Sequence, residues 1–330
     1  MLLRYPDYFE HFRCIASRCT DSCCKEWEVQ VDDSTAQKYL AMDGALGEDL
    51  RKFLRNEDDV WYLTVTEGRC PMWRQDGLCR IQAEQGHDAL CQTCRDFPRL
   101  THDYGSFVER GLELSCPTAA ELILSGRHGW VENEVDADEE ADYDPADMEI
   151  LLETRDVMLT ILSDESRPIP QVLALALLYG YQAQSLLDGE DSQWDEAQAL
   201  VFAHQLARKS DPAELLRFYM GLEILTDTWR QRLLQPLGST HWDKRLLALA
   251  RYGIERYYLQ AISDFDLVGR VKMVILSCLL VHQLGGDLTQ TAQLYGKEIE
   301  NNDDNVDTLL QGAYDSPLLT DDRILGLLLL

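Results

Sequence analysis

Apolar positions recur at helical spacing through the second half of the chain. Between residues 148 and 162, apolar side chains return every three or four positions, as they do on one face of an amphipathic helix. Similar spacing continues downstream, and several of the segments start after Ser, Asp or Thr, which can cap a helix. The predicted helices span residues 148–162, 170–187, 194–208, 211–235, 242–264 and 267–285. This half is therefore expected to form an α-helical domain.

The first third of the chain has shorter and less regular apolar runs. These runs predict strands at 27–31 and 60–65 and helices at about 34–55 and 117–125. Asp32, Asp33 and Ser34 are candidates to cap the first of these helices, and Pro117 suits the first turn of the second. The expected fold is mainly α, with a loop-rich cysteine-cluster region containing short strands followed by the helical domain.

A strongly acidic stretch separates these two parts. Between Val131 and Glu149 the chain holds ten acidic residues, almost no aliphatic ones, and Pro145. Such a composition favours a solvated connector over a packed element. We therefore predict a cysteine-rich domain at 1–130, an acidic linker at 131–147 and a helical domain at 148–330.

Charge and hydropathy bear on location and partners. The formal net charge of -28 repels phosphate backbones, so nucleic acid is not an expected partner. No secretory signal is visible, and no window reaches the roughly 18 apolar residues that span a bilayer. The longest candidate, Met273 to Val281, suits a buried core helix. A cytoplasmic protein is expected.

The apolar C-terminal run, residues 324–330, is too short to cross a membrane. It is expected to lie in a groove of the helical domain. The alternative is a weak membrane contact or self-association through this run.

The cysteines are concentrated in the first third of the chain. Nine of the ten lie between Cys14 and Cys116, and only Cys278 lies beyond them. Cytoplasmic thiols stay reduced, so disulfides are not expected. Core cysteines scattered at random would not cluster in this way, and the distribution therefore favours a metal site. Cys278 falls inside an apolar helix and is expected to be a core residue.

The nine cysteines form four motifs. They are Cys14-x4-Cys19-x3-Cys23-Cys24, Cys70-Pro71 followed by Cys79, Cys91-x2-Cys94, and Cys116-Pro117. Thiolates a few residues apart can converge on one metal, as in zinc and iron–sulfur sites. Nine thiols exceed one zinc site, so the count favours an iron–sulfur cluster, with zinc as the alternative. Individual thiols can also be small buried hydrophobes.

These motifs strongly resemble those of the flagellin lysine-N-methylase family. The resemblance rests on the run from Phe12 to Trp27, and on Cys70-Pro71, Gly77-Leu78-Cys79-Arg80-Ile81, Cys91-Gln92-Thr93-Cys94-Arg95-Asp96-Phe97-Pro98-Arg99 and Leu114-Ser115-Cys116-Pro117. They are also similar to a broader group of cysteine-cluster proteins that chelate zinc or iron. The likeness covers residues 5–125, while only a helical tendency is recognised in 150–330.

The resemblance implies S-adenosylmethionine-dependent methylation of lysine ε-amines on flagellin, with flagellin as partner and a 4Fe-4S cluster as cofactor. The implied ligand candidates are Cys14, Cys19, Cys23, Cys24, Cys70, Cys79, Cys91, Cys94 and Cys116. The sequence departs from two common patterns, because no Gly-x-Gly-x-x-Gly follows a strand and Glu26 interrupts a Cys-x3-Cys-x2-Cys signature.

Other residues are candidates for supporting roles. Arg95 and Arg99 could offset a thiolate cluster or pair with the carboxylate of S-adenosylmethionine. Asp96, Tyr104 and Glu109 are possible bases, although packing and surface roles are the commoner use of such residues. Two other function classes remain open: a non-catalytic zinc or iron–sulfur module with a partner-docking helical domain, and a redox sensor with exposed reactive thiols.

Overall fold

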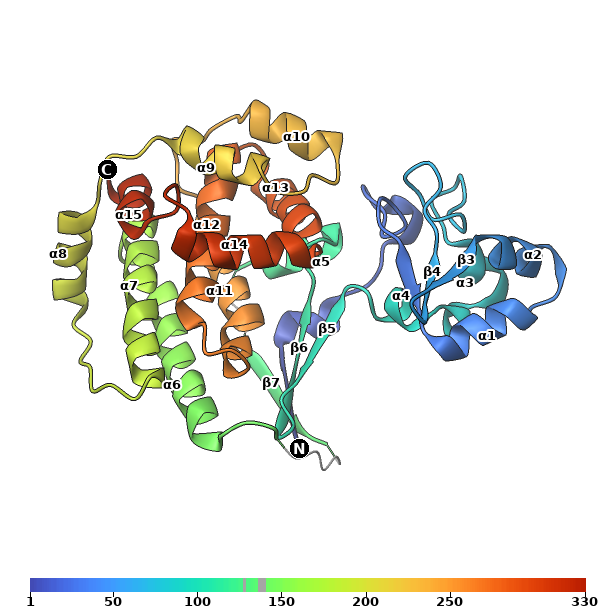
Figure 1. Cartoon of the computed structure of the whole chain (residues 1–330), viewed down its shortest axis with the longest axis horizontal. Helices are drawn as coiled ribbons and strands as arrows, with labels where there is room; N and C mark the ends of the chain where they lie inside the picture. Colours follow the sequence, from blue (N-terminus) through green and yellow to red (C-terminus); the bar gives the residue numbers. More distant parts are fainter. Residues whose placement is uncertain (127–128, 136–140) are drawn as a thin grey trace.

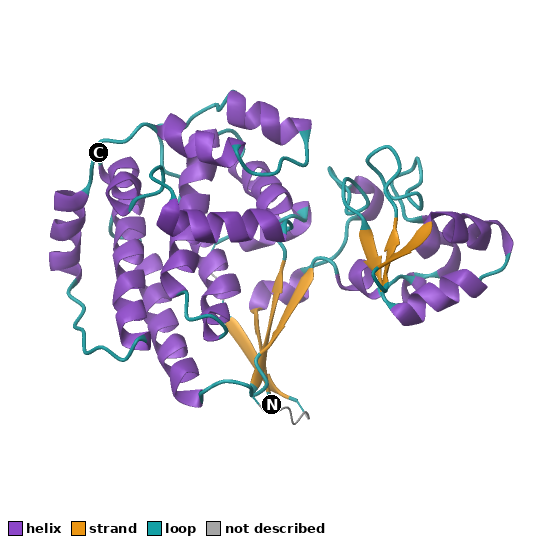
Figure 2. Cartoon of the chain, viewed as in Figure 1, coloured by secondary structure: helices purple, strands orange, loops and turns teal. Residues whose placement is uncertain are grey.

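A computed structural model describes residues 1–126, 129–135 and 141–330. The chain is 57% helical and 11% strand. This composition confirms the expected fold class, with short strands in the N-terminal region and helices in the C-terminal part. Figures 1 and 2 show a large helical body and a smaller lobe, with a sheet beside the body.

The helical body contains the helices predicted from the apolar spacing. Its helices are α6 (Pro145–Leu162), α7 (Ile169–Leu187), α8 (Glu196–Leu206), α9 (Pro212–Met220), α10 (Asp227–Leu234), α11 (Arg245–Tyr257), α12 (Leu267–Leu284), α13 (Leu288–Tyr295), α14 (Asp303–Asp315) and α15 (Asp321–Leu329). The single helix expected over 211–235 is wrong. The chain turns after Gly221, and the Thr226 side chain caps a separate α10 by accepting from the Trp229 amide.

Helix α12 lies at the centre of the body. It contacts α7, α11, α13 and α14, and nearly all of its side chains are buried. Length and apolar composition alone would let α12 cross a membrane, but 94% of it is buried inside the protein. The expectation of a core helix around Met273–Val281 is therefore confirmed, and Cys278 is fully buried within it.

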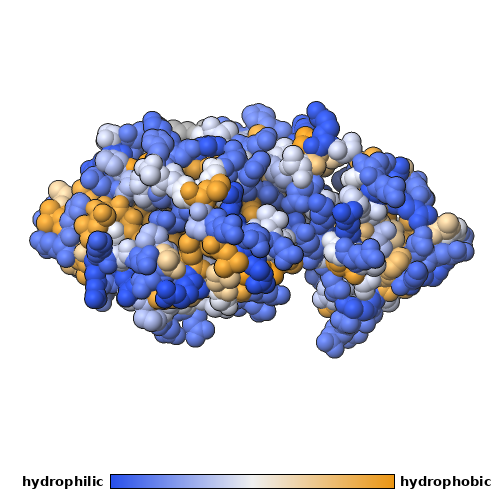
Figure 3. Space-filling model, turned by 90° about the horizontal axis from the view of Figure 1, so that it is seen from above, coloured by the Kyte–Doolittle hydropathy of each residue, from blue (hydrophilic) through white to orange (hydrophobic). Residues whose placement is uncertain are grey.

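The apolar C-terminal run also packs inward. It forms most of α15, which lies against α7 and α8. Ile324, Leu325 and Leu328 are buried, whereas the terminal Leu330 is 73% exposed. The expected position in a groove of the helical domain is thus confirmed. The face of the molecule in Figure 3 is largely hydrophilic, with apolar patches on the body.

A four-stranded sheet that the apolar pattern did not predict lies beside the body. Its order is β5 (Arg99–Asp103), β6 (Phe107–Leu112), β1 (Leu2–Pro6) and β7 (Trp130–Glu134). Strand β1 runs parallel to β6, with Leu2 opposite Phe107, and antiparallel to β7. Between the sheet and α6, Arg155 donates two 2.7 Å hydrogen bonds to the buried Glu109 carboxylate.

The small lobe consists of a three-stranded antiparallel sheet and short helices. The sheet order is β2 (Val29–Val31), β4 (Val60–Leu63), β3 (Leu54–Glu57), and the helices are α1 (Asp33–Ala41), α2 (Gly44–Phe53), α3 (Arg80–Gln85) and α4 (Gln92–Asp96). The continuous helix expected over 34–55 is wrong, because Gly44 adopts φ 81° and divides it. Of the three candidate caps, Asp32 caps α1, because its side chain accepts a hydrogen bond from the Thr35 amide.

The hydrophobic cores follow a different division from the predicted domains. One core lies within residues 29–91, in the small lobe. The other joins the helical body to N-terminal residues such as Tyr8, Phe12 and Cys116. Of the predicted linker, residues 131–134 pair in β7 and Pro145 begins α6, while 136–140 lie outside the described residues. Helix α5 (Pro117–Ile123), which confirms the helix expected after Cys116, packs on α13 of the body.

Candidate metal centre

The cysteines of the four motifs fall into two groups. All ten cysteines of the chain lie within the described residues, and each is a free thiol. The six-thiol group belongs to the small lobe and comprises Cys23, Cys24, Cys70, Cys79, Cys91 and Cys94. The three-thiol group comprises Cys14, Cys19 and Cys116, of which Cys116 belongs to the core of the body.

Backbone contacts bring the motifs of the six-thiol group together. The amide of Cys70 donates to the carbonyl of Cys24 at 2.7 Å, which joins the first motif to the second. Trp73 and Cys79 form an isolated bridge, and the Arg80 amide donates to the Met72 carbonyl at 2.7 Å. These contacts fold the loop between Cys70 and Cys79 back on itself. Its two thiols therefore lie near each other, although nine positions separate them in sequence.

The thiols of the six-thiol group also contact one another directly. A hydrogen bond from Cys23 lowers the pKa of Cys24. The hydrogen bond that Cys24 donates to Cys70 and the burial of Cys24 act in the opposite direction and prevail, so the pKa of Cys24 is raised to about 12. The same bond from Cys24 holds the pKa of Cys70 below its usual value. In the third motif, Cys94 donates to Cys91, which raises the pKa of Cys94 and lowers that of Cys91. Neighbouring sulfurs of this group are thus close enough to influence one another's pKa.

The three-thiol group lies where the first motif meets the body. Burial raises the pKa of Cys116 to about 11, with smaller contributions from the nearby Cys19 and Cys14 thiols. Burial also raises the pKa of Cys19, which lies near both Cys14 and Cys23. Cys19 therefore connects the two groups along the first motif. The structure brings all nine predicted ligand candidates into these groups and leaves Cys278 apart.

The donor set fits a soft metal centre by its chemistry. Clustered thiols are ligands for zinc and for iron–sulfur clusters, and binding replaces their shared protons with metal. Among the residues that the structure describes, no group of three or more Cys, His, Asp or Glu side chains has the geometry of a ready-made metal site.

The two candidate arginines differ in their surroundings. Arg95 lies in α4 directly after Cys94 and is half-buried, with no ion-pair partner among the described side chains. Arg99 is exposed, and its guanidinium lies 5.1 Å from the centre of the Phe12 ring. Both lie near cysteine motifs, and neither guanidinium has an ion-pair partner among the side chains that the structure describes.

The candidate bases are less suited to catalysis. Glu109 is buried and bound by Arg155, as described above, so its carboxylate has a structural role. Tyr104 is buried and stacks on Phe107 with ring centres 4.9 Å apart, and burial raises its pKa. Asp96 is exposed at the end of α4. Glu109 and Tyr104 thus have the surroundings of structural residues.

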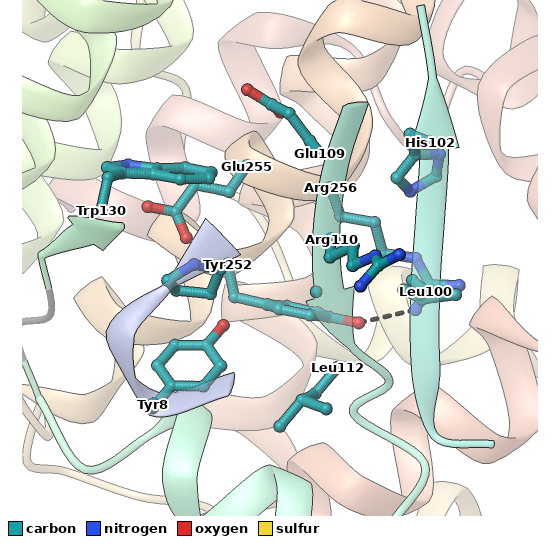
Figure 4. A pocket seen from close by; sticks show the side chains of 12 residues that line it. Tyr8, Leu100, His102, Glu109, Arg110, Leu112, Trp130, Tyr252, Glu255 and Arg256 are labelled. Carbon is teal, nitrogen blue, oxygen red and sulfur yellow. Dashed lines mark hydrogen bonds between the residues drawn. The ribbon is translucent and has the colours of Figure 1, made fainter. Parts of the chain in front are cut away.

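A small cavity lies between β5, β6 and α11. Figure 4 shows Tyr8, Tyr252 and Leu112 on one side of it and His102 across from them. Burial, with a smaller effect of Arg256, lowers the pKa of His102. The cavity measures about 30 Å³, which suits water rather than a nucleoside cofactor. Five cavities in the described part of the chain, this one included, have no cysteine in their walls.

Sequence reasoning missed the charged residue that links the cysteine motifs to the body. Lys297 is 5% exposed and lies within ion-pair distance of Asp21 and Glu26, which flank Cys23 and Cys24. A single buried lysine in a helical stretch gives no signal in sequence that it will meet a motif more than 270 positions away. Only the tertiary structure reveals this contact.

The fold and the thiols define a cysteine-cluster protein with a helical body, and comparison with known proteins gives its family. The chain is 37% identical over 127 residues to the flagellar biosynthetic protein FliU of Salmonella muenchen, a match that covers 36% of this chain and 75% of FliU. The chain is also 36% and 35% identical over 127 residues to lysine-N-methylases of Salmonella choleraesuis (strain SC-B67) and Salmonella typhimurium.

The chain therefore belongs to the family of FliU and the lysine-N-methylases, which confirms the resemblance seen in the sequence. The matched region spans 32% of the length of each of these lysine-N-methylases. No protein-family model and no solved structure matches the chain.

Proposed function

We propose that this protein is a metal-dependent protein lysine N-methyltransferase that modifies flagellin in the cytoplasm. The observation that carries the proposal is the convergence of all four cysteine motifs into two adjoining thiol groups. Relatives named lysine-N-methylase support the reaction class. The methyl donor in this proposal is S-adenosylmethionine, and the metal centre is a 4Fe-4S cluster, with zinc as the alternative.

The residues have separate tasks in this proposal. The six-thiol group would hold the metal centre, because its thiols are already in mutual contact and come from three of the four motifs. When bound, an iron–sulfur cluster supplies electron transfer and a Lewis-acidic iron. The Arg95 guanidinium would pair with the donor's carboxylate. The lysine ε-amine must lose its proton before it accepts a methyl group, so an apolar approach to the centre favours reaction.

A second candidate is a non-catalytic metal module or redox sensor. The observation in its favour is that no cysteine lines any of the five cavities mentioned above. None of these cavities would therefore hold S-adenosylmethionine beside the thiols. Cys14 and Cys23 are exposed, as a sensor would require. The helical body would then serve to dock a partner.

Metal analysis tests the centre. The full-length chain, purified anaerobically, should contain iron and sulfide, and Cys94→Ser should lose them. Cys278→Ser is the matched control, because Cys278 is fully buried in α12 and outside both thiol groups. A colourless wild-type protein with zinc and no iron would exclude the iron–sulfur cluster. Equal iron in the wild-type and Cys94→Ser proteins would remove Cys94 from the ligands.

Methyl transfer is tested separately. Flagellin co-expressed with the wild-type chain should carry methylated lysines by mass spectrometry, whereas flagellin co-expressed with Cys94→Ser should not. Unmodified flagellin in the presence of a metal-loaded wild-type protein would exclude flagellin methylation and support the module or sensor. The Cys278→Ser variant again serves as control, and it should methylate flagellin as the wild type does.

A further inference from the structure

A buried lysine of the helical body binds the first cysteine motif from both sides of its Cys-Cys pair. Lys297 Nζ lies 3.1 Å from Asp21 Oδ2 and 2.6 Å from Glu26 Oε2. The lysine is almost fully buried, and its two partners are only partly exposed. A buried ammonium group between two carboxylates is held strongly in place, because removing it leaves uncompensated charge.

The residue one turn before Lys297 extends this contact to the fourth motif. Gln293 Nε2 lies 3.2 Å from Asp21 Oδ2 and donates a 2.7 Å hydrogen bond to the carbonyl of Ser115. Ser115 directly precedes Cys116. Positions four apart lie on the same face of a helix, so Gln293 and Lys297 form one docking surface. One amide group thus brings the Cys19–Cys23 loop next to Cys116.

The backbone at this surface is adapted to a close approach. A Cβ on Gly296 would lie 2.8 Å from the Ser115 amide nitrogen and 2.9 Å from Leu114 Cβ, so only glycine fits there. Gly296–Glu300 forms a π-helical turn, a local irregularity often found at functional positions. On the other side, Glu26 adopts φ 73°, which a non-glycine residue seldom takes without tertiary contacts to hold it.

We propose that Gln293 and Lys297 are positioning residues that dock the first cysteine motif of the small lobe against Cys116 of the body. This docking assembles the three-thiol group, because Gln293 binds both Asp21, two residues after Cys19, and Ser115, directly before Cys116. The six-thiol group joins it through the adjacent Cys23 and Cys24. This inference concerns the thiol centre of the proposed function, but it does not require that the centre transfers methyl groups.

Site-resolved alkylation of the full-length protein, as purified anaerobically, tests the docking. In Lys297→Met, iodoacetamide should modify Cys19 and Cys116 about tenfold faster than in the wild type, because the undocked state becomes more populated. Cys91, which is held within the small lobe, should react at the wild-type rate. Peptide mass spectrometry measures each cysteine separately, so a local loss of docking is distinguished from general unfolding.

Matched variants make the test decisive. Lys272→Met removes an equally buried lysine, paired with Asp321 at 3.1 Å in the body, and should leave the alkylation of Cys19 and Cys116 unchanged. Gln293→Leu should increase both rates without removing a charge, and it carries the test if Lys297→Met does not fold. Asp21→Asn combined with Lys297→Met should be no faster than Lys297→Met alone.

Unchanged rates at Cys19 and Cys116 in Lys297→Met, or in Gln293→Leu where it replaces that variant, would overturn the inference. An equal increase at all cysteines, Cys91 included, would also overturn it, because it would show general destabilisation. Failure of the proposed function gives a different result: flagellin stays unmodified by the wild type, while the alkylation pattern of the variants is unaffected.

Discussion

The close contact at Gly296 provides a test of the packing between the body and the segment before Cys116. In Gly296→Ala, the new methyl group meets backbone and Cβ atoms of Leu114 and Ser115 at 2.8–3.0 Å, below any normal contact distance. Backbone atoms cannot rotate away as a flexible side chain can. Overpacking of this kind costs about 1–3 kcal/mol. Alanine recovers about 0.5–1 kcal/mol of helix propensity, so we expect a net loss of roughly 0.5–2 kcal/mol.

Urea unfolding followed by far-ultraviolet circular dichroism measures this loss as a lower transition midpoint. Gly111→Ala is the matched control, because a Cβ at Gly111 in β6 meets nothing within 4 Å. The control should unfold at the same or a slightly higher urea concentration. If Gly296→Ala unfolds at the same urea concentration as Gly111→Ala, the close approach of the π-helical turn to the Ser115 segment is refuted.

Three further predictions concern stability. Arg155→Met should lower the free energy of unfolding by about 3–5 kcal/mol in urea titrations, because the buried Glu109 loses two 2.7 Å hydrogen bonds and keeps only a 3.6 Å ion pair with Arg4. The double variant with Glu109→Gln should recover much of this loss, and additive losses would refute the pairing. Asp32→Ala should cost about 1 kcal/mol at pH 7. The hydrogen bond from the Gln92 amide, with that from Thr35, lowers the pKa of Asp32. The stabilisation that the Asp32 carboxylate gives the fold is therefore complete above its unfolded pKa of about 4 and is lost as the pH falls below that value. A stability difference between the wild type and Asp32→Ala that is undiminished near pH 3 would contradict this. Leu325→Ala should lower the free energy of unfolding by about 2–5 kcal/mol, measured by thermal or urea unfolding, because Leu325 is fully buried. Leu330→Ala, at an exposed position, should be as stable as the wild type. Equal stabilities of the two variants would refute the docking of α15.

Helices α6, α7, α8, α11 and α12 fall on predicted segments, because apolar positions recur along each of them, whereas α13, α14 and α15 lie outside the predicted segments. The periodic run at 148–162 corresponds to α6, which begins three residues earlier at Pro145 after the capping Asp144. The failures occurred where one residue overrides the pattern. Gly44 divides the helix expected over 34–55, since its φ of 81° cannot continue an α-helix.

The four-stranded sheet could not be predicted from local sequence. Strand β1 pairs with residues more than 100 positions away. In β5, Leu100 is the one apolar residue of five, which is too few to give a strand pattern. The spacing of the cysteines predicts a metal site. It does not indicate that they divide between two hydrophobic cores, because this division depends on which lobe each loop joins.

The partners of β1 and of the first cysteine motif are made late during synthesis. Strand β1 has its hydrogen-bonding partners at residues 107–109 and 130–134, so it waits for over a hundred further residues to leave the ribosome. At 5–20 residues per second, that wait is roughly 5–20 s. Lys297, which holds the first motif, is made later still. The thiols from Cys14 to Cys24 therefore leave the ribosome long before the residue that docks their motif, and during this interval oxidation can compete with docking.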